Sequence, residues 1–324
     1  MVFNKAGYDP FIDFLKAYSI LIVVFCHGFP CLDKIGYAVW GVQIPLFFLV
    51  QVFHCYKRDP KPINWGVIWK RIVLPFVTVE LFVFGALCLV GGGKNMIQLL
   101  KEGIMSGGYG PGSYYPWIYL QMVIVIPLLR PVCEKLGKWK SLLIFILLSI
   151  AIEVICSTAN LPDFIYRLLC IRYIFLIWIG WIWVKEGIQC NAFNIVTSIM
   201  SLCIIVYFAY FRGNLEPFFY ETGWATHRWI CYFWVGFAFS WLLYRMYKYI
   251  NKSESINKAI KTLAAASWEV FLVQMAYYAV VLPKYFEFIG SQIIQFGLWF
   301  ALAFVVSIPG GIWLHKLEMK YILK

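Results

Sequence analysis

The sequence predicts an all-α integral membrane protein with about ten transmembrane helices. Of its 324 residues, 62 % are hydrophobic and 14 % are charged, whereas an average soluble domain is roughly 45–50 % apolar and about 25 % charged. So few polar residues cannot cover the outside of a soluble fold of this size. The apolar runs are continuous rather than alternating, which favours helices over barrel strands. This composition excludes a soluble globular protein, a disordered chain and a small disulfide scaffold.

The individual helices follow from the lengths of the apolar runs. A spanning helix needs about 20 mostly apolar residues. Between the runs no repeat and no separate soluble domain is visible, so we expect one polytopic domain over residues 1–324. The ten runs lie near 11–30, 36–54, 66–90, 114–130, 141–157, 168–184, 193–211, 229–247, 265–282 and 291–315.

The basic residues predict the orientation. If both termini are cytoplasmic, 20 of the 28 lysines and arginines fall on the inner side, as the positive-inside rule requires. The net charge of +12 then has a source in these loops, and we expect no nucleic-acid partner. The ten cysteines form no CxxC pair and no zinc-type spacing, so we expect no metal and interpret them as small buried residues.

The first predicted helix contains the sharpest polar pattern. Lys16 and His27 are eleven residues apart, which brings them to nearly the same helix face, roughly 16 Å apart along the axis. Asp13 lies one turn before Lys16 and supports it as an ion-pair partner. Ionisable groups inside a membrane are costly and usually mark sites or pathways. The structural alternatives are a histidine bonded to a neighbouring helix and a lysine anchored at the interface.

The following residues carry a resemblance to a known family. DFLKAYSILIVVFCHG at 13–28 resembles the opening R/K-x10-H motif of the membrane acyltransferase 3 family. Val50-Gln51, Lys70-Arg71 and Gln274 stand where the family often has Ser-Gly, an Arg-x-x-Arg pair and a histidine. Further similar stretches are WGVQIPLFFLV at 40–50, WKRIVLPF at 69–76, YYPWIYLQM at 114–122 and SWEVFLVQM at 267–275.

The resemblance implies a multi-pass enzyme of the bacterial cytoplasmic membrane that O-acylates extracytoplasmic glycans. Acetyl-CoA or another acyl-CoA is then the donor, and a polysaccharide or lipid-linked glycan is the acceptor, with membrane lipid around the chain. His27 is implied as the base that takes the hydroxyl proton, or as a transient acyl carrier. Lys16, Lys70 and Arg71, at the predicted cytoplasmic ends of their helices, are expected to bind the donor's phosphates.

Other polar and aromatic residues have both a functional and a structural interpretation. Glu80, inside the third predicted helix, either orients His27 or stabilises its protonated form, or it bonds a neighbouring helix; we place it with His27 as catalytic. Tyr114, Tyr115 and Trp117 begin the fourth predicted helix at the outer face, where aromatic rings stack on sugars but also form the ordinary interfacial belt. The same two interpretations, site or structure, apply to Glu153, Glu269, Arg172 and Arg228.

Two further functions stay open from the sequence alone. Buried Glu80, Glu153 and Glu269 fit a proton-coupled transporter or a flippase for a lipid-linked sugar. A degenerate acyltransferase that binds coenzyme A or a glycan without turnover is the third hypothesis, and the replacements at Gln51 and Gln274 favour it.

Overall fold

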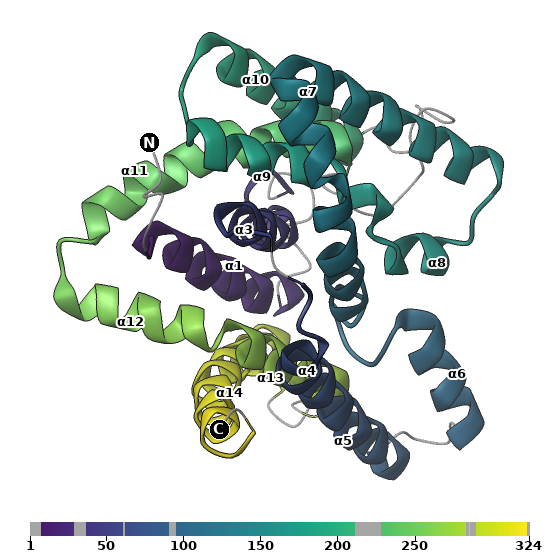
Figure 1. Ribbon diagram of the computed structural model, residues 1–324. Helices are drawn as coiled ribbons and strands as arrows, with labels where there is room; N and C mark the ends of the chain where they lie inside the picture. Colours follow the sequence, from purple (N-terminus) through teal and green to yellow (C-terminus); the bar gives the residue numbers. More distant parts are fainter. Residues whose placement is uncertain are drawn as a thin grey trace. The chain divides into compact units, whose positions relative to one another are not determined.

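The computed structural model describes residues 8–28, 37–60, 62–90, 95–210, 228–282, 285 and 290–322, which contain helices and turns and no strand (Figure 1). The elements are α1 (Pro10–Gly28), α2 (Tyr37–Trp40), α3 (Gln43–Lys57), α4 (Trp65–Ile68), η2 (Trp69–Val73), α5 (Leu74–Val90), α6 (Met96–Ser106), α7 (Tyr115–Thr158), α8 (Asp163–Leu168), η3 (Cys170–Tyr173), α9 (Phe175–Glu186), α10 (Ala192–Tyr210), η4 (Trp229–Cys231), η5 (Trp234–Phe239), α11 (Ser240–Ile250), α12 (Glu254–Ala265), α13 (Ser267–Val280) and α14 (Gln292–Tyr321).

Helices occupy each of the ten stretches that the apolar runs mark, and the chain is an all-α, multi-pass membrane protein. Within the described residues five helices are long and apolar enough to cross a membrane, or six if the bent pair α12–α13 forms one span. Ten spans and cytoplasmic termini stay predictions. The five helices are Pro10–Gly28, Trp65–Val90, Tyr115–Thr158, Ala192–Tyr210 and Ile294–Tyr321.

The chain divides into two compact units, which are described separately. Each unit is assembled from stretches that are distant in the sequence, and one domain over residues 1–324 stays a prediction. Unit 1 comprises Met1–Ser19, Cys31–Pro62 and Tyr119–Lys261, and unit 2 comprises Ile20–Pro30, Ile63–Ile118 and Thr262–Lys324.

Unit 1 has an aromatic core around α9. Gly180 of α9 lets α3 approach closely, because a Cβ there would lie 2.5 Å from Cγ1 of Val52. Phe175 packs against Phe233 with ring centroids 5.0 Å apart. Trp183 donates its indole N–H to the carbonyl of Gly236 in η5 at 2.7 Å. Small residues at helix contacts are the usual means of packing inside a membrane, where lipid offers no hydrophobic drive for association.

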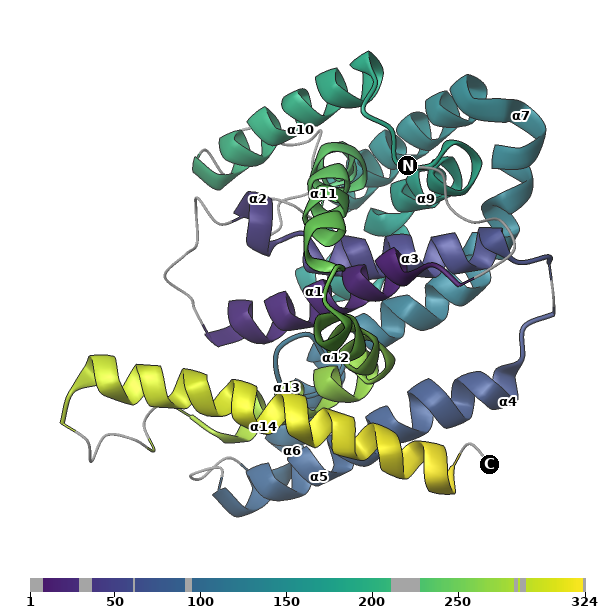
Figure 2. The ribbon, with the colours of Figure 1, turned by 90° about the vertical axis from the view of Figure 1, so that its left-hand side faces the viewer.

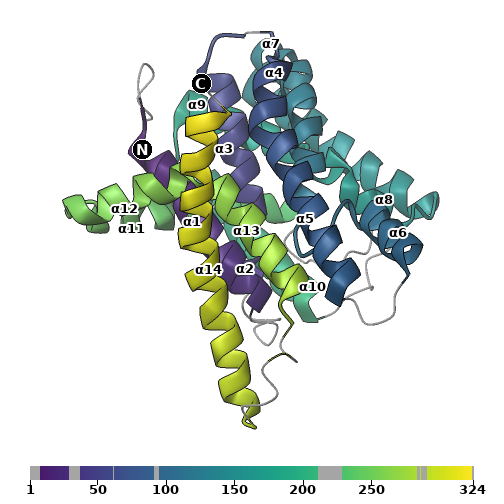
Figure 3. The same ribbon diagram turned by 90° about the horizontal axis from the view of Figure 1, so that it is seen from below.

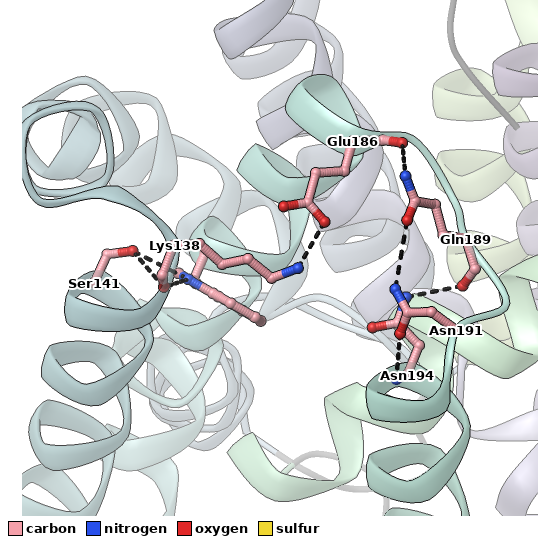
Figure 4. Close-up of polar contacts among 7 residues, drawn as sticks. Lys138, Ser141, Glu186, Gln189, Asn191 and Asn194 are labelled. Carbon is pink, nitrogen blue, oxygen red and sulfur yellow. Dashed lines mark hydrogen bonds and ion pairs between the residues drawn. The ribbon is translucent and has the colours of Figure 1, made fainter.

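A polar network joins α7, α9 and α10 at one end of unit 1 (Figure 4). Lys138 Nζ lies 2.7 Å from Oε2 of Glu186, and the Gln189 side chain donates to the Glu186 carbonyl at 2.8 Å. Asn191 caps α10 by accepting the backbone N–H of Asn194 at 2.9 Å. These contacts hold the short predicted inner loop between α9 and α10 against the start of the second half of α7.

Unit 2 is built around α13, which packs against α14 and α5 while α6 packs on α5. Figures 2 and 3 show α13 and α14 side by side. Gly311 permits this approach, because a Cβ there would lie 2.4 Å from Cα of Val270. Tyr277 donates to the carbonyl of Trp299 at 2.7 Å, and Trp299 donates to the carbonyl of Val281 at 2.7 Å. The two helices are therefore joined by polar bonds as well as by packing.

Candidate active site

Helix α1 carries the predicted polar pattern on one unbroken helix. Asp9 accepts the N–H of Phe11 at 3.0 Å, and Pro10 occupies the first helical position, where its missing N–H costs nothing. Lys16 Nζ lies 3.7 Å from Oδ1 of Asp13, as the ion-pair prediction required. His27 follows near the other end of the helix, just before the final residue Gly28.

His27 is held by α13 within unit 2. Its Nδ1 lies 2.9 Å from Oε1 of Gln274. The ring of Tyr278 meets the imidazole edge to face, with centroids 6.0 Å apart at 79°, and the Tyr278 hydroxyl donates to the carbonyl of Val24 at 2.8 Å. Nε2 of His27 has no hydrogen-bond partner within the described part of the chain. The side chain is half-buried, so one nitrogen is fixed and the other is open.

A glycine loop, defined as Gly107–Tyr114, lies against this histidine. The side chain of Gln274 donates from Nε2 to the carbonyl of Pro111 at 3.5 Å. Gly112 has φ +90°, and a Cβ there would lie 3.7 Å from Cε1 of His27 and 2.9 Å from the Phe271 ring. The loop therefore contacts the imidazole through backbone that only glycine adopts without strain.

Glu80 of α5 anchors the same loop. Its Oε2 accepts the backbone N–H of Tyr109 at 2.7 Å. Its Oε1 is buried and has no hydrogen-bond partner among the described residues, and a Cβ on Gly108 would lie 2.4 Å from that oxygen. Within the described residues Glu80 thus contacts the loop and not the imidazole, and Gln274 is the residue that bonds His27. A catalytic role of Glu80 stays a prediction.

The three aromatic residues after the loop have different surroundings. Tyr115 is buried and packs on Phe271 with centroids 5.5 Å apart, and Tyr114 is half-buried. Trp117 is 46 % exposed and donates its indole N–H to the carbonyl of Gly107 at 2.6 Å. Trp117 is therefore the one of the three with a largely accessible ring, and it also supports the loop.

Lys70 and Arg71 lie in the π-helical turn η2, which interrupts the helix from α4 to α5. Both side chains are exposed. Such turns are rare and occur often at functional sites. Lys16 belongs to unit 1 and the other two cations to unit 2, so each is described within its own unit.

A second polar cluster lies on α13 and α14 of unit 2. His315 Nδ1 lies 2.7 Å from Oε1 of Glu269. Buried Glu318 interacts electrostatically with Glu269 and with Arg71. Among the described residues, Oε2 of Glu269 and Oε1 of Glu318 have no hydrogen-bond partner. Among the described residues no three His, Cys, Asp or Glu side chains gather where they could hold a metal ion.

Sequence reasoning did not find the partners of the site residues. Gln274 was noted only as a departure from the family pattern, and it is 247 positions from His27. Tyr278, one turn further along α13, gave no signal, because a tyrosine in an aromatic-rich span is ordinary. The bond from Glu80 ends on a backbone N–H, which no residue pattern reveals.

The sequence matches a known family over nearly its whole length. No curated protein and no solved structure matches the chain. Residues 9–316 match the family described as an acyltransferase domain. The matched range includes every residue named at the site except Glu318. Because that match extends over nearly the whole length, the chain belongs to the acyltransferase 3 family.

Proposed function

We propose that this membrane acyltransferase moves an acyl group, most simply acetyl, from acyl-CoA on the cytoplasmic side to a hydroxyl of an extracytoplasmic glycan. The observation that carries the proposal is the state of His27, which is half-buried in an apolar helix, fixed at Nδ1 and open at Nε2. Histidine titrates near neutrality and serves both as a base and as a nucleophile.

The proposed reaction needs one group that takes a proton. The hydroxyl oxygen attacks the thioester carbonyl carbon, its proton passes to Nε2 of His27, and the carbon–sulfur bond breaks. The proton then goes to the coenzyme A thiolate. In the alternative route Nε2 first takes the acyl group and then gives it to the hydroxyl. Both routes use the same nitrogen, and general base catalysis of this kind is worth about 10²–10⁴ in rate.

Within unit 2, the donor's phosphates are proposed to bind Lys70 and Arg71 in η2. Both side chains are exposed, so they can take up a phosphate without first losing a buried partner. Lys16, on the helix that carries His27, is proposed as a further donor-binding cation. The same helix α1 places Lys16 about 16 Å from His27 along its axis. That is the order of length of an extended pantetheine arm, so the thioester would reach the imidazole.

The acceptor is proposed to approach past the glycine loop. Trp117, whose ring is largely accessible, is the aromatic residue that best fits stacking on a sugar. Tyr114 and Tyr115 would then act mainly by supporting the loop, since Tyr115 is buried against α13. A polysaccharide and a lipid-linked glycan are both acceptors of this chemistry.

The test uses full-length protein reconstituted in sealed vesicles of both orientations. We expect label to pass from radiolabelled acetyl-CoA to a cell-envelope glycan fraction only when the donor is on the side of the basic loops. His27→Ala should abolish transfer while the protein keeps its thermal unfolding midpoint. Transfer by His27→Ala at the wild-type rate, or use of the donor from the glycan side alone, would contradict the proposal.

The transporter alternative has less support. A coupling carboxylate must bind and release protons on a pathway, yet Glu153 accepts the hydroxyl of buried Tyr166 at 3.0 Å and Glu269 is bonded to His315. These bonds fit roles in holding helices together. The non-catalytic alternative rested on Gln51 and Gln274, and the contact of Gln274 with His27 supports a use of that glutamine in catalysis.

A further inference from the structure

We propose that Gln274 is a positioning residue that fixes the proton of His27 on Nδ1, so that Nε2 is the reacting atom. This inference rests on the proposed function for its catalytic meaning, but the position of the proton can be measured without any turnover. It assigns a role to a residue that departs from the usual family pattern.

The first step is the identity of the two bonded atoms. Nδ1 of His27 lies 2.9 Å from Oε1 of Gln274. An amide oxygen can only accept a hydrogen bond, so Nδ1 must donate. In a neutral imidazole only one nitrogen carries the proton. Nε2 is then left with its lone pair, the form that a base or a nucleophile needs.

The second step is the orientation of the amide, since oxygen and nitrogen of a glutamine side chain are exchanged by a flip. The other end of the amide faces the carbonyl of Pro111 at 3.5 Å. A carbonyl can only accept, so the NH₂ group belongs on that side. In the flipped amide two acceptor oxygens would face each other. The glycine loop therefore fixes the orientation of the Gln274 amide, and the amide fixes the position of the proton on the imidazole.

The third step explains why the loop stays in place. Gly110 has φ +85°, and a Cβ there would lie 2.4 Å from the backbone oxygen of Met275, the neighbour of Gln274. Tyr109, on its other side, is bonded to Glu80. Pro111 lies directly after these contacts, so its carbonyl is presented to Gln274 by backbone fixed on both α5 and α13.

The direct test is nitrogen-15 NMR of the histidines in full-length protein reconstituted in lipid bilayers. The chain has four histidines, and the His27→Ala spectrum identifies the signals of His27. We expect a protonated Nδ1 and an unprotonated Nε2 in the wild type. Gln274→Glu keeps an acceptor oxygen, so Nδ1 should stay protonated, but its carboxylate favours the imidazolium, so Nε2 should lose its proton only at a higher pH than in the wild type. In Gln274→Leu we expect proton density to appear on Nε2.

The activity test separates positioning from support of the fold. Gln274→Leu removes the acceptor that holds the proton on Nδ1, so it should lower kcat roughly tenfold or more with KM for the donor unchanged. Gln274→Glu should restore kcat only at a pH at which Nε2 has lost its proton, so its pH profile should move to higher pH. Tyr277→Phe is the matched control, because it removes a buried hydrogen bond of the same helix that does not touch His27.

Three outcomes would overturn the inference. They are a wild-type proton on Nε2, an unchanged His27 spectrum in Gln274→Leu, and an equal loss of kcat in Tyr277→Phe. Failure of the proposed function looks different. A wild type that transfers no acyl group but carries the proton on Nδ1 contradicts the acyltransferase activity and leaves the assigned hydrogen bond standing.

Discussion

Helix α13 holds two histidines through two kinds of partner. Gln274 bonds Nδ1 of His27, and Glu269, five positions earlier, bonds Nδ1 of His315. A neutral amide oxygen favours the charged form of an imidazole only weakly, whereas a carboxylate favours it strongly. The two histidines therefore differ in the charge of their partner. The neutral partner of His27 suits a histidine that accepts a proton, and the carboxylate partner of His315 suits an ion pair between helices.

The largest expected effect separates the two histidines directly. His27→Ala should lower acyl transfer by about 10²–10⁴, the usual worth of a general base. His315→Ala should keep most of the transfer rate but destabilise the fold by about 1–3 kcal/mol, because buried Glu269 loses its partner. Transfer rates and thermal unfolding of both variants check this. Equal loss of transfer in the two variants would erase the distinction.

The glycine loop lies beside His27, so a change in the loop should affect His27 rather than His315. Gly110→Ala should destabilise unit 2 by about 1–3 kcal/mol through backbone strain. It should also lower the rate of acyl transfer, because the added Cβ would meet the Met275 carbonyl. Gly290→Ala is the matched control, since Gly290 has φ +76° but nothing within 4 Å of the added carbon. Transfer that falls equally in both variants would show that strain alone, and not the loop contact, is responsible.

Variants of Glu80 test whether the glycine loop next to His27 needs a negative charge or only a hydrogen-bond acceptor. Glu80→Gln keeps an oxygen that can accept the N–H of Tyr109, so transfer should change less than about threefold, within the net worth of one neutral hydrogen bond. Glu80→Leu removes the acceptor and should lower transfer roughly tenfold. Steady-state rates at several donor concentrations check this. A Gln variant as inactive as the Leu variant would assign the effect to the negative charge instead.

The smallest expected effect concerns Glu318, in the cluster of Glu269 and His315, and it is an effect on stability rather than on transfer. Glu318→Gln keeps a polar side chain of the same shape, so the unfolding midpoint should move little, whereas Glu318→Leu removes a buried oxygen that has no hydrogen-bond partner among the described residues and should raise the free energy of unfolding by about 1 kcal/mol. Transfer should stay near wild type in both. Thermal unfolding in detergent checks the difference, and a marked loss of transfer in Glu318→Gln would connect this cluster to the reaction.

Much of the fold could be read from the apolar runs, because lipid forces a helix of minimum length on each span. The predicted first helix at 11–30 is α1, Pro10–Gly28. The polar stretch between the fourth and fifth predicted helices is less simple. It stays helical within α7 and breaks only at Gly137, with φ +69°. The lysines and arginines of this stretch, which the search for apolar runs assigns to a loop, are good helix formers. Composition alone therefore did not locate the break in the helix.

The site was predictable at His27 and not at its partners. Spacing along one helix is written in the sequence, so Asp13, Lys16 and His27 were placed on a common element. Contacts between helices distant in the chain are decided by packing, which explains why Gln274, Tyr278 and the Pro111 carbonyl needed the structure. For Tyr115 the sequence could not predict burial, because an aromatic residue at the start of a helix fits both a sugar site and the membrane interface, and its packing inside unit 2 depends on residues distant in the chain.

The π-helical turn η2 has a consequence for length changes in this chain. A wide turn accommodates one residue more than the α-helical path around it, and each residue of an α-helix turns the following face by about 100°. Removing a single position from Trp69–Val73 would therefore return the segment to regular winding and leave Glu80 facing Tyr109, whereas removing one position from the regular helix between this turn and Glu80 would swing it away. Homologues that are one residue shorter in the turn should keep the anchor of the loop, and homologues that are one residue shorter after it should have lost it.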